Sequence, residues 1–243
     1  MIDTFTRHQA YLQQYANGDV RRALTLLKKT SKELQDKIAA HLVTDFQLNR
    51  AKEMEQEIRA IISNITGEIK SVVDDSIKDL AAHEVAFTEK VIGSMVTVGL
   101  AAVPINQIMG AITNTPMVLR GGQVVRSITP AEMFLEFAGS AGRDVWQTVQ
   151  SGSILGRTTQ QIIRDVLNLV NGRTRAQVES VVRTSLQHSA SVAYGEFTKA
   201  NADILIGERW SATLDGKTSV FCQATDGKIF PVGEGPQWPA HFR

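Results

Sequence analysis

The sequence predicts a mainly α-helical protein, in which a helical N-terminal region precedes a small α+β C-terminal module with β-hairpins. Three observations carry this prediction. Residues 1 to about 90 contain no proline and only two glycines, and their apolar side chains recur at helical spacing. Three stretches between residues 131 and 200 repeat that spacing. From Ile204 onward, short runs of strand-forming residues alternate with Asp-Gly turns.

The composition is that of an ordinary globular protein. Of the 243 residues, 43% are hydrophobic and 21% are charged, which argues against wholesale disorder and against a fibrous repeat. The length favours one large or two small domains, and we expect a division into residues 1–120 and 121–243. Lysine and arginine number 26 against 25 acidic residues, so the chain lacks the overall basic excess of a nucleic-acid coat protein. A single cysteine, Cys222, excludes an intramolecular disulfide framework.

The N-terminal region is predicted to form a helical hairpin or a small bundle. One apolar stripe steps by four and three residues, as a helix face does; it consists of Ile58, Ile62, Ile65, Ile69 and Val72. Asn17 or Asp19 is expected to cap a helix, since both residue types favour the N-cap position. The apolar residues of that helix are Val20, Ala23, Leu24 and Leu27.

A local cluster of cations on this region is the candidate nucleic-acid contact. It consists of Arg21, Arg22, Lys28, Lys29 and Lys32. Such a cluster can neutralise phosphates even though the whole chain is nearly neutral. The competing interpretation is a solvated helix face, which is the commoner role of short runs of this kind.

The segment from Val91 to Leu119 contains no charged residue. A transmembrane helix needs about twenty consecutive apolar residues, whereas Pro104, Asn106 and Gln107 interrupt this one. We therefore expect a buried helix or an oligomer contact, and keep membrane spanning as the alternative.

A loop around Gly121-Gly122 is expected to lead into the next helix, and the domain boundary fits there. Thr129 is the predicted N-cap and Pro130 occupies the first helical position, where its missing N–H does no harm. The inward-facing side chains of the helix over 131–151 are predicted to be Phe134, Leu135, Ala138, Val145, Trp146 and Val149.

Two further helices follow. Thr158 or Thr159 opens the first of them, and Asn171-Gly172 is expected to end it. Its apolar face consists of Ile162, Ile163, Val166, Leu167 and Val170. The second runs from Arg175 to about Ala200 and buries Val178, Val181, Val182, Leu186, Ala190, Ala193 and Phe197.

The C-terminal residues are predicted to form short strands and tight turns. Strand-forming runs at 204–206 and 208–213 precede the turn Asp215-Gly216, and Asp226-Gly227 forms a second turn before residues 228–231. Residues 233–243 are too rich in glycine and proline for regular structure.

The motifs of common enzyme classes are missing from the sequence. There is no Gly-rich phosphate loop with its lysine, no Gly-x-Ser-x-Gly elbow, no His-Glu-x-x-His and no Cys-x-x-Cys. Cys222 and His241 are weak metal-ligand candidates, because zinc needs three or four protein ligands. No residue is assigned a catalytic role and no cofactor is predicted.

An ordered series of motifs over about the last 110 residues resembles the head-morphogenesis domain of the Mu F-like minor head proteins of tailed phages. A Gly152-x-x-x-Gly156 helix pair comes first, and Arg183-Thr184 follow on a helix that continues through small and polar residues to Glu196. The series then has Trp210, Asp215, Lys217-Thr218, Cys222, Asp226-Gly227, Phe230, Pro236, Pro239 and His241. Family members usually continue as His-x-x-Cys-Arg, and the sequence ends one residue short of that Cys.

The resemblance implies a minor structural protein of the virion that associates with the portal vertex and assembles in the host cytoplasm. Its expected partners are the portal protein, capsid or scaffolding protein and packaged DNA, and it is expected to form a homo-oligomer or a multi-copy ring. It would act in head assembly or accompany DNA during ejection. Trp210, Cys222 and Phe230 are interpreted as the core of its C-terminal module. Alternatives are a DNA-binding protein, a membrane-active ejection protein that uses Val91–Leu119, and a metal-dependent hydrolase.

Overall fold

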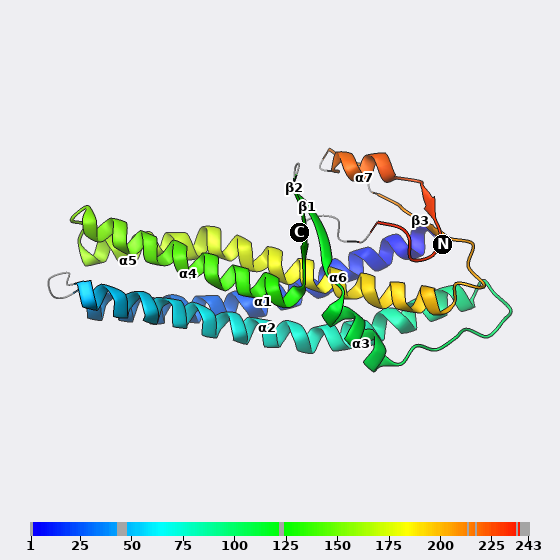
Figure 1. Cartoon of the computed structure of the whole chain (residues 1–243), viewed down its shortest axis with the longest axis horizontal. Coiled ribbons are helices and arrows are strands. Elements are labelled where there is room, and N and C mark those ends of the chain that lie inside the picture. The colour runs from blue at the N-terminus through cyan, green and yellow to red at the C-terminus, as the bar shows by residue number, and fades with distance from the viewer. Residues whose placement is uncertain are drawn as a thin grey trace. The chain divides into compact units, whose positions relative to one another are not determined.

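The computed structural model describes residues 2–42, 48–121, 124–212, 214–216, 218–236 and 238. Within these residues the fold is mainly α-helical, which confirms the predicted fold class (Figure 1). The helices are α1 (Ile2–His41), α2 (Leu48–Gly93), α3 (Ile105–Asn114), α4 (Pro130–Ile154), α5 (Thr159–Leu169), the π-helix η1 (Val170–Thr174), α6 (Arg175–Ala200) and α7 (Val220–Thr225). The strands are β1 (Met117–Gly121) and β2 (Val124–Ile128), which pair, and β3 (Glu208–Arg209) and β4 (Ile229–Phe230), which also pair.

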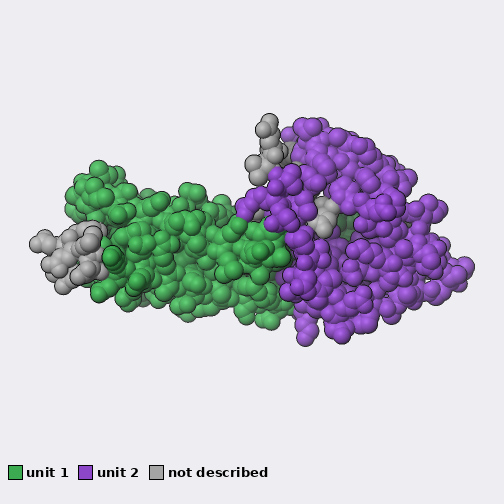
Figure 2. Space-filling model, in the orientation of Figure 1, with its two compact units in different colours: residues 1–76, 128–186, 242–243 green, residues 77–127, 187–241 purple. Residues whose placement is uncertain are grey.

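The chain forms two compact units, coloured separately in Figure 2. The described residues of unit 1 fall within 1–76 and 128–186, and those of unit 2 fall within 77–127 and 187–241. Each unit therefore draws on both halves of the sequence. The division into domains at residue 120 stays a prediction.

In unit 1, α1 and α2 form the predicted helical hairpin. Near the start of α1, the Tyr15 hydroxyl donates a hydrogen bond to the Ser76 carbonyl over 3.0 Å. Near its end, His41 Nε2 lies 3.1 Å from Glu57 Oε2. Partner numbers fall along α2 as they rise along α1, so the helices run antiparallel. His41 and then Lys37, which lies 3.2 Å away, hydrogen-bond Glu57 and lower the pKa of its carboxyl group.

The apolar stripe of α2 is buried as its spacing predicts. Ile58, Ile62 and Ile69 are at most 1% exposed. The stripe continues through Val73, which is fully buried, whereas Val72 is only half-buried. Val72 and Val73 lie on opposite sides of the stripe's centre line, and Val73 is the more deeply buried of the two.

The expected cap at Asn17 or Asp19 is wrong, because α1 continues through both residues. Asp19 is fully buried in the middle of the helix. Its Oδ1 accepts a hydrogen bond from the Ser76 hydroxyl over 3.0 Å and another from Arg22. A residue type that usually opens helices is accommodated here because α2 and the next turn of α1 supply its partners.

The connection between α4 and α5 is built from signals that the sequence carries. Thr129 caps α4 in a capping box with Glu132, which lowers the pKa of Glu132, and Thr158 caps α5 in the same way with Gln161. At the end of α4, the Arg157 N–H donates to the Gly152 carbonyl over 2.9 Å and the Gly156 N–H donates to the Ser153 carbonyl over 3.1 Å. This is a Schellman motif, and Gly156 takes the left-handed conformation it requires (φ +67°).

Helices α4 and α5 lie close together at Gly152. A Cβ atom at this position would lie 2.6 Å from Ile162 Cγ1, and Ile162 is only 2% exposed and has little room to move. We expect Gly152→Ala to lower the free energy of unfolding by about 1–3 kcal/mol, measured by urea denaturation followed by far-UV circular dichroism.

Gly67→Ala is the matched control for this variant. Gly67 lies inside α2 and no atom lies within 4 Å of its Cβ position. Alanine is the better helix former, so this substitution should raise stability by about 0.5–1 kcal/mol. Equal effects of the two substitutions would show that the close approach of α4 and α5 has no energetic consequence.

Two predictions about the helices of unit 1 are corrected. Asn171-Gly172 does not end α5, because η1 carries the chain through these residues directly into α6. Leu135 does not face the core: it is 72% exposed, and Phe137 is buried instead. The apolar residues assigned to α6 are all buried, as predicted.

In unit 2, the uncharged segment 91–119 is not one helix. It comprises the end of α2, an irregular stretch over 94–104, α3, residues 115–116 and the start of β1. In the part of the chain that the structure describes, no helix combines the length and apolarity that crossing a membrane requires. The loop expected near Gly121-Gly122 is flanked by β1 and β2, which the sequence analysis did not predict. Ile108, Ile112, Met117 and Leu119 are buried.

Candidate functional site

Most of the motif residues lie in a small module of unit 2 formed by β3, α7 and β4. The strands are antiparallel, with Glu208 opposite Phe230 and Arg209 opposite Ile229. An Asp226 oxygen accepts a hydrogen bond from the Ala212 N–H over 2.8 Å. Gly227 follows with φ +77°, and its N–H donates to the Trp210 carbonyl over 2.9 Å. The Asp226-Gly227 turn is therefore confirmed, and its carboxylate holds the backbone of the module together.

The hairpin expected at Asp215-Gly216 is wrong. The Thr218 hydroxyl and an Asp215 side-chain oxygen lie 3.0 Å apart in a local turn, and α7 begins immediately after it. The Ser219 hydroxyl accepts a hydrogen bond from the Cys222 N–H over 3.2 Å and caps this helix. The sequence from 215 to 219 fits a turn before a helix as well as a turn between strands, so the local signal was ambiguous.

An aromatic pair stabilises the module. Trp210 and Phe221 meet edge to face, with ring centroids 6.1 Å apart. The guanidinium carbon of Arg120, on β1, lies 4.3 Å from the centre of the Phe221 ring, within reach of a cation–π interaction. Sequence reasoning missed Arg120 and Phe221, because nothing local connects residues a hundred positions apart. Trp210, Cys222 and Phe230, which are interpreted as the core of the module, are each half-buried.

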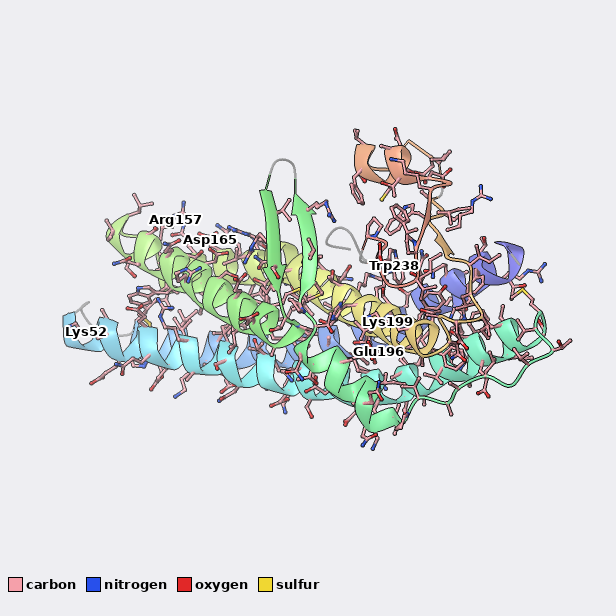
Figure 3. All side chains as sticks on the ribbon, turned by 45° about the vertical axis from the view of Figure 1, so that its right-hand side comes forward. Lys52, Arg157, Asp165, Glu196, Lys199 and Trp238 are labelled. Carbon is pink, nitrogen blue, oxygen red and sulfur yellow. The ribbon has the colours of Figure 1, made fainter. Side chains whose placement is uncertain are left out.

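Glu208 joins this module to α6 within unit 2. Its Oε1 accepts a hydrogen bond from the Thr198 hydroxyl over 2.9 Å, and its Oε2 accepts one from the Gly233 N–H over 3.1 Å. Burial, with the Glu208 charge as a second cause, raises the pKa of Tyr194 to about 12. Glu196 and Lys199 form an ion pair of 3.3 Å one turn apart on α6 (Figure 3). The sequence analysis did not single out Glu208.

The amide group of Asn201 holds the irregular stretch that follows α2. Its Oδ1 accepts a hydrogen bond from the Ala101 N–H over 2.7 Å, and its Nδ2 donates to the Ala101 carbonyl over 3.1 Å. Nδ2 also donates to the Phe197 carbonyl over 2.9 Å. Asn201 is 2% exposed, so this uncharged stretch has one defined attachment point at the end of α6.

The remaining motif residues lie elsewhere. Arg183 and Thr184 belong to unit 1, where Arg183 donates a hydrogen bond to Asn17 Oδ1 over 2.7 Å and Thr184 is fully buried. Lys217 and His241 lie outside the described residues. Among the residues that are described, no group of three or more His, Cys, Asp or Glu side chains is placed to hold a metal ion.

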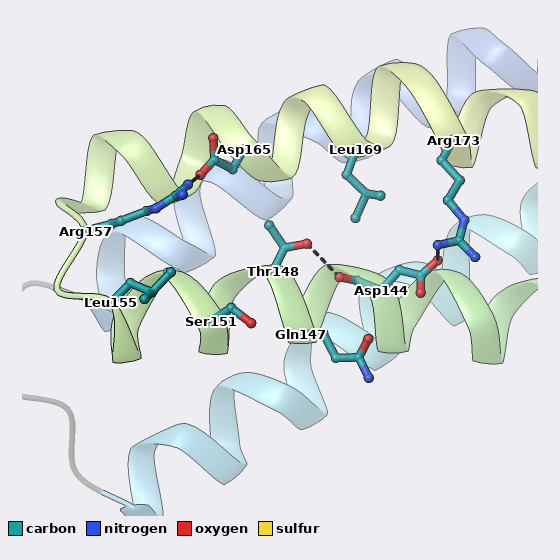
Figure 4. Close-up of a pocket in the computed structure, with 10 residues that line it drawn as sticks. Asp144, Gln147, Thr148, Ser151, Leu155, Arg157, Asp165, Leu169 and Arg173 are labelled. Atoms are coloured by element: carbon teal, nitrogen blue, oxygen red, sulfur yellow. Dashed lines mark hydrogen bonds and ion pairs between the residues drawn. The ribbon is translucent and has the colours of Figure 1, made fainter.

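Unit 1 contains an open polar groove of about 410 Å³ between α4 and α5 (Figure 4). One end carries the Arg157–Asp165 ion pair, and the other carries Arg173 Nη1 at 3.2 Å from Asp144 Oδ2. Arg173 projects from η1, so the π-helical turn brings this cation to α4. The full lining is Asp144, Gln147, Thr148, Ser151, Gly152, Leu155, Arg157, Asp165, Leu169 and Arg173.

The charged side chains that line this groove are paired with one another. Each of its two carboxylates faces an arginine, and none of the ten lining residues is a histidine, cysteine or lysine. A catalytic constellation needs a nucleophile or a general base with a group that orients it. The lining supplies polar and apolar contacts but no such pair.

All five members of the basic cluster lie on α1 and are exposed. Arg22 is bound to the buried Asp19 and to the Ser76 hydroxyl at 2.9 Å, so it serves the helix pair. The other four cations remain on the surface. Comparisons of the chain with protein-family models, with curated proteins and with solved structures find no match.

Proposed function

We propose that this protein is a minor structural component of a tailed-phage head that binds the portal and acts in head assembly or accompanies DNA during ejection. The proposal begins from the resemblance of the C-terminal motif series to Mu F-like minor head proteins. It treats the chain as an interaction protein, and no step of it requires a catalytic residue.

The observation that carries the proposal is that the motif residues have structural roles within the C-terminal module. Asp226 accepts from a backbone N–H, Gly227 takes a left-handed conformation, and Trp210 packs against Phe221. These are structural roles, and they support a motif series that specifies a rigid module. Such a module suits a protein that has to be positioned within an assembly.

Unit 1 exposes large apolar side chains to which a partner can bind. On α4, Leu135 and Ile154 are 72% and 75% exposed, and Leu155, which follows the helix, is 68% exposed. Large apolar side chains on the surface are available for burial in a contact with another protein. We infer that unit 1 makes the contact with the portal.

Co-expression with the portal protein encoded beside it, followed by size-exclusion chromatography with light scattering, tests the proposal. A complex of defined mass is the expected result. The double variant Leu135→Lys/Ile154→Lys should weaken the complex at least tenfold, because each charge would lie in an apolar contact.

The matched control places two lysines on the other unit. Val220 and Ile229 are 81% and 70% exposed, so Val220→Lys/Ile229→Lys changes the charge equally and should leave the complex intact. Clean separation of the wild-type proteins would refute portal binding. Loss of the complex in the control alone would move the contact to the C-terminal module.

A further inference from the structure

Three cations form a line along the exposed side of α1, and a fourth lies beside it. Successive residues of an α-helix are rotated by about 100°, so Arg21, Lys28 and Lys32 lie within about 40° of each other around the axis, with Lys29 beside them. All four are exposed. The line extends over about 16 Å, or three turns. We call these four residues the basic stripe.

Few acidic residues neighbour the basic stripe along α1. No Asp or Glu occurs from Val20 to Lys32. Glu33 and Asp36 follow in the next turns, but among the described residues none of the stripe cations forms an ion pair. Arg21 donates only to the Asn17 carbonyl, at 3.3 Å, which leaves its charge uncompensated.

Several other exposed cations of unit 1 are paired. Lys37 pairs with Glu57 over 3.2 Å, Arg59 with Glu55 over 2.7 Å, and Arg175 with Glu179 over 3.1 Å. In the basic stripe, Glu33 and Asp36 occupy the i+4 positions of Lys29 and Lys32, but among the described residues neither acid forms an ion pair with its lysine. A row of like charges on one helix face repels itself, so a bound polyanion would stabilise it.

We propose that the basic stripe binds the phosphate backbone of duplex DNA. The duplex presents one negative charge for about every 1.7 Å of its axis, so several phosphates fall within reach of a 16 Å row of cations. Three of the four residues are lysines, which act as point charges and suit contacts with phosphates better than readout of bases. The buried Asp19–Arg22 contact fixes the adjacent turn of α1 against α2, so the stripe lies on an anchored helix.

The proposal predicts weak binding that ignores sequence and depends on salt. Four phosphate contacts give a slope of about −3.6 in a plot of log K against log salt concentration, or about 150-fold loss of affinity between about 50 and 200 mM salt. Fluorescence anisotropy of the full chain with two labelled duplexes of unrelated sequence measures both properties.

The triple variant Lys28→Gln/Lys29→Gln/Lys32→Gln removes most of the stripe. We expect the slope to fall in magnitude by about 2.7, and the affinity at low salt to fall at least tenfold. The matched control is Lys52→Gln/Lys78→Gln/Lys90→Gln, which removes three exposed lysines of α2. Each of these lies beside an acidic residue in the sequence, namely Glu53, Asp79 and Glu89, and the control should bind as the wild type does.

The outcomes separate this proposal from others. Equal loss in the two triple variants would mean that net charge alone drives association, and the proposal fails. Binding to vesicles of anionic lipid with no binding to duplex DNA would also overturn it. The inference does not rest on the phage-head proposal, because DNA binding and portal binding are measured separately and either can fail alone.

Discussion

Replacing Arg22 by alanine is expected to lower the free energy of unfolding by about 3–5 kcal/mol, because it leaves a buried carboxylate without its cation. Asp19 is fully buried, and its Oδ2 already lacks a hydrogen-bond partner among the described residues. Arg22 donates to Asp19 Oδ1 and, over 2.9 Å, to the Ser76 hydroxyl. The hydrogen bond with Asp19 raises the pKa of the Arg22 guanidinium.

Chemical denaturation of three further variants tests the cause. Arg21→Ala is the matched control, since Arg21 is the neighbouring exposed arginine, and its effect should stay within about 0.5 kcal/mol. Asp19→Ala should cost less than Arg22→Ala, because Arg22 is 60% exposed and water can solvate it. The double variant Arg22→Ala/Asp19→Ala should recover much of the loss. If it is less stable than Arg22→Ala alone, the unpaired carboxylate is not the cause.

Acidification is expected to destabilise unit 2 through His188. This residue is 2% exposed, and burial lowers its pKa to about 4, although the carbonyl groups of Thr115 and Ile112 favour the protonated ring. An unfolded chain restores the ordinary value of about 6.5, so the unfolded state binds more protons between these two pH values. Stability is therefore fully present above about pH 6.5 and falls by up to about 3 kcal/mol as the pH approaches 4.

Thermal or urea unfolding across this pH range measures the effect. His188→Gln should flatten the dependence of stability on pH, whatever its effect at neutral pH, because glutamine does not titrate. His83→Gln is the matched control, since His83 is exposed on α2, and it should leave the slope unchanged. An unchanged slope in His188→Gln would assign the acid sensitivity to other groups.

The stability of the Asp19–Arg22 contact also bears on the proposed binding of DNA by the basic stripe. Within unit 1, Asp19 and Arg22 flank Arg21 of the basic stripe, and both hydrogen-bond to Ser76 of α2. Loss of Arg22 should therefore weaken DNA binding indirectly, through the helix, whereas the lysine variants should weaken it with little change in stability. Measuring both quantities in each variant separates the folding role from the binding role.

Much of the helical architecture could be predicted from local sequence. Periodic apolar residues gave the buried faces of α2 and α6, and Thr129 and Thr158 gave the starts of α4 and α5, because caps depend on residues within one turn. The same local reasoning failed at Asp19 and at Asn171-Gly172. Both have the composition of a helix boundary, and in both the chain remains helical because neighbouring residues and helices satisfy the backbone and side chains.

The site was less predictable than the fold. Arg120 and Phe221 meet across a hundred residues, and Glu208 joins α6 to the glycine-rich end of the module; neither contact has a local signal. The basic stripe could be predicted in part. The five cations of the basic cluster were evident in the sequence, but only the structure separates Arg22, which is bound to Asp19, from the four that form the basic stripe.

By itself, the sequence determined that this protein is mainly helical, where α4 and α5 begin, and most of the apolar residues that α2 and α6 bury, since these properties depend on neighbours within a few residues. The tertiary structure decided the antiparallel register of α1 and α2, the continuation of α5 through η1 into α6, and the placement of α7 between β3 and β4. The physical reason is that a residue such as Asp19 or Gly152 has its energy set by a partner distant in the chain, and that partner is known only once the chain has folded.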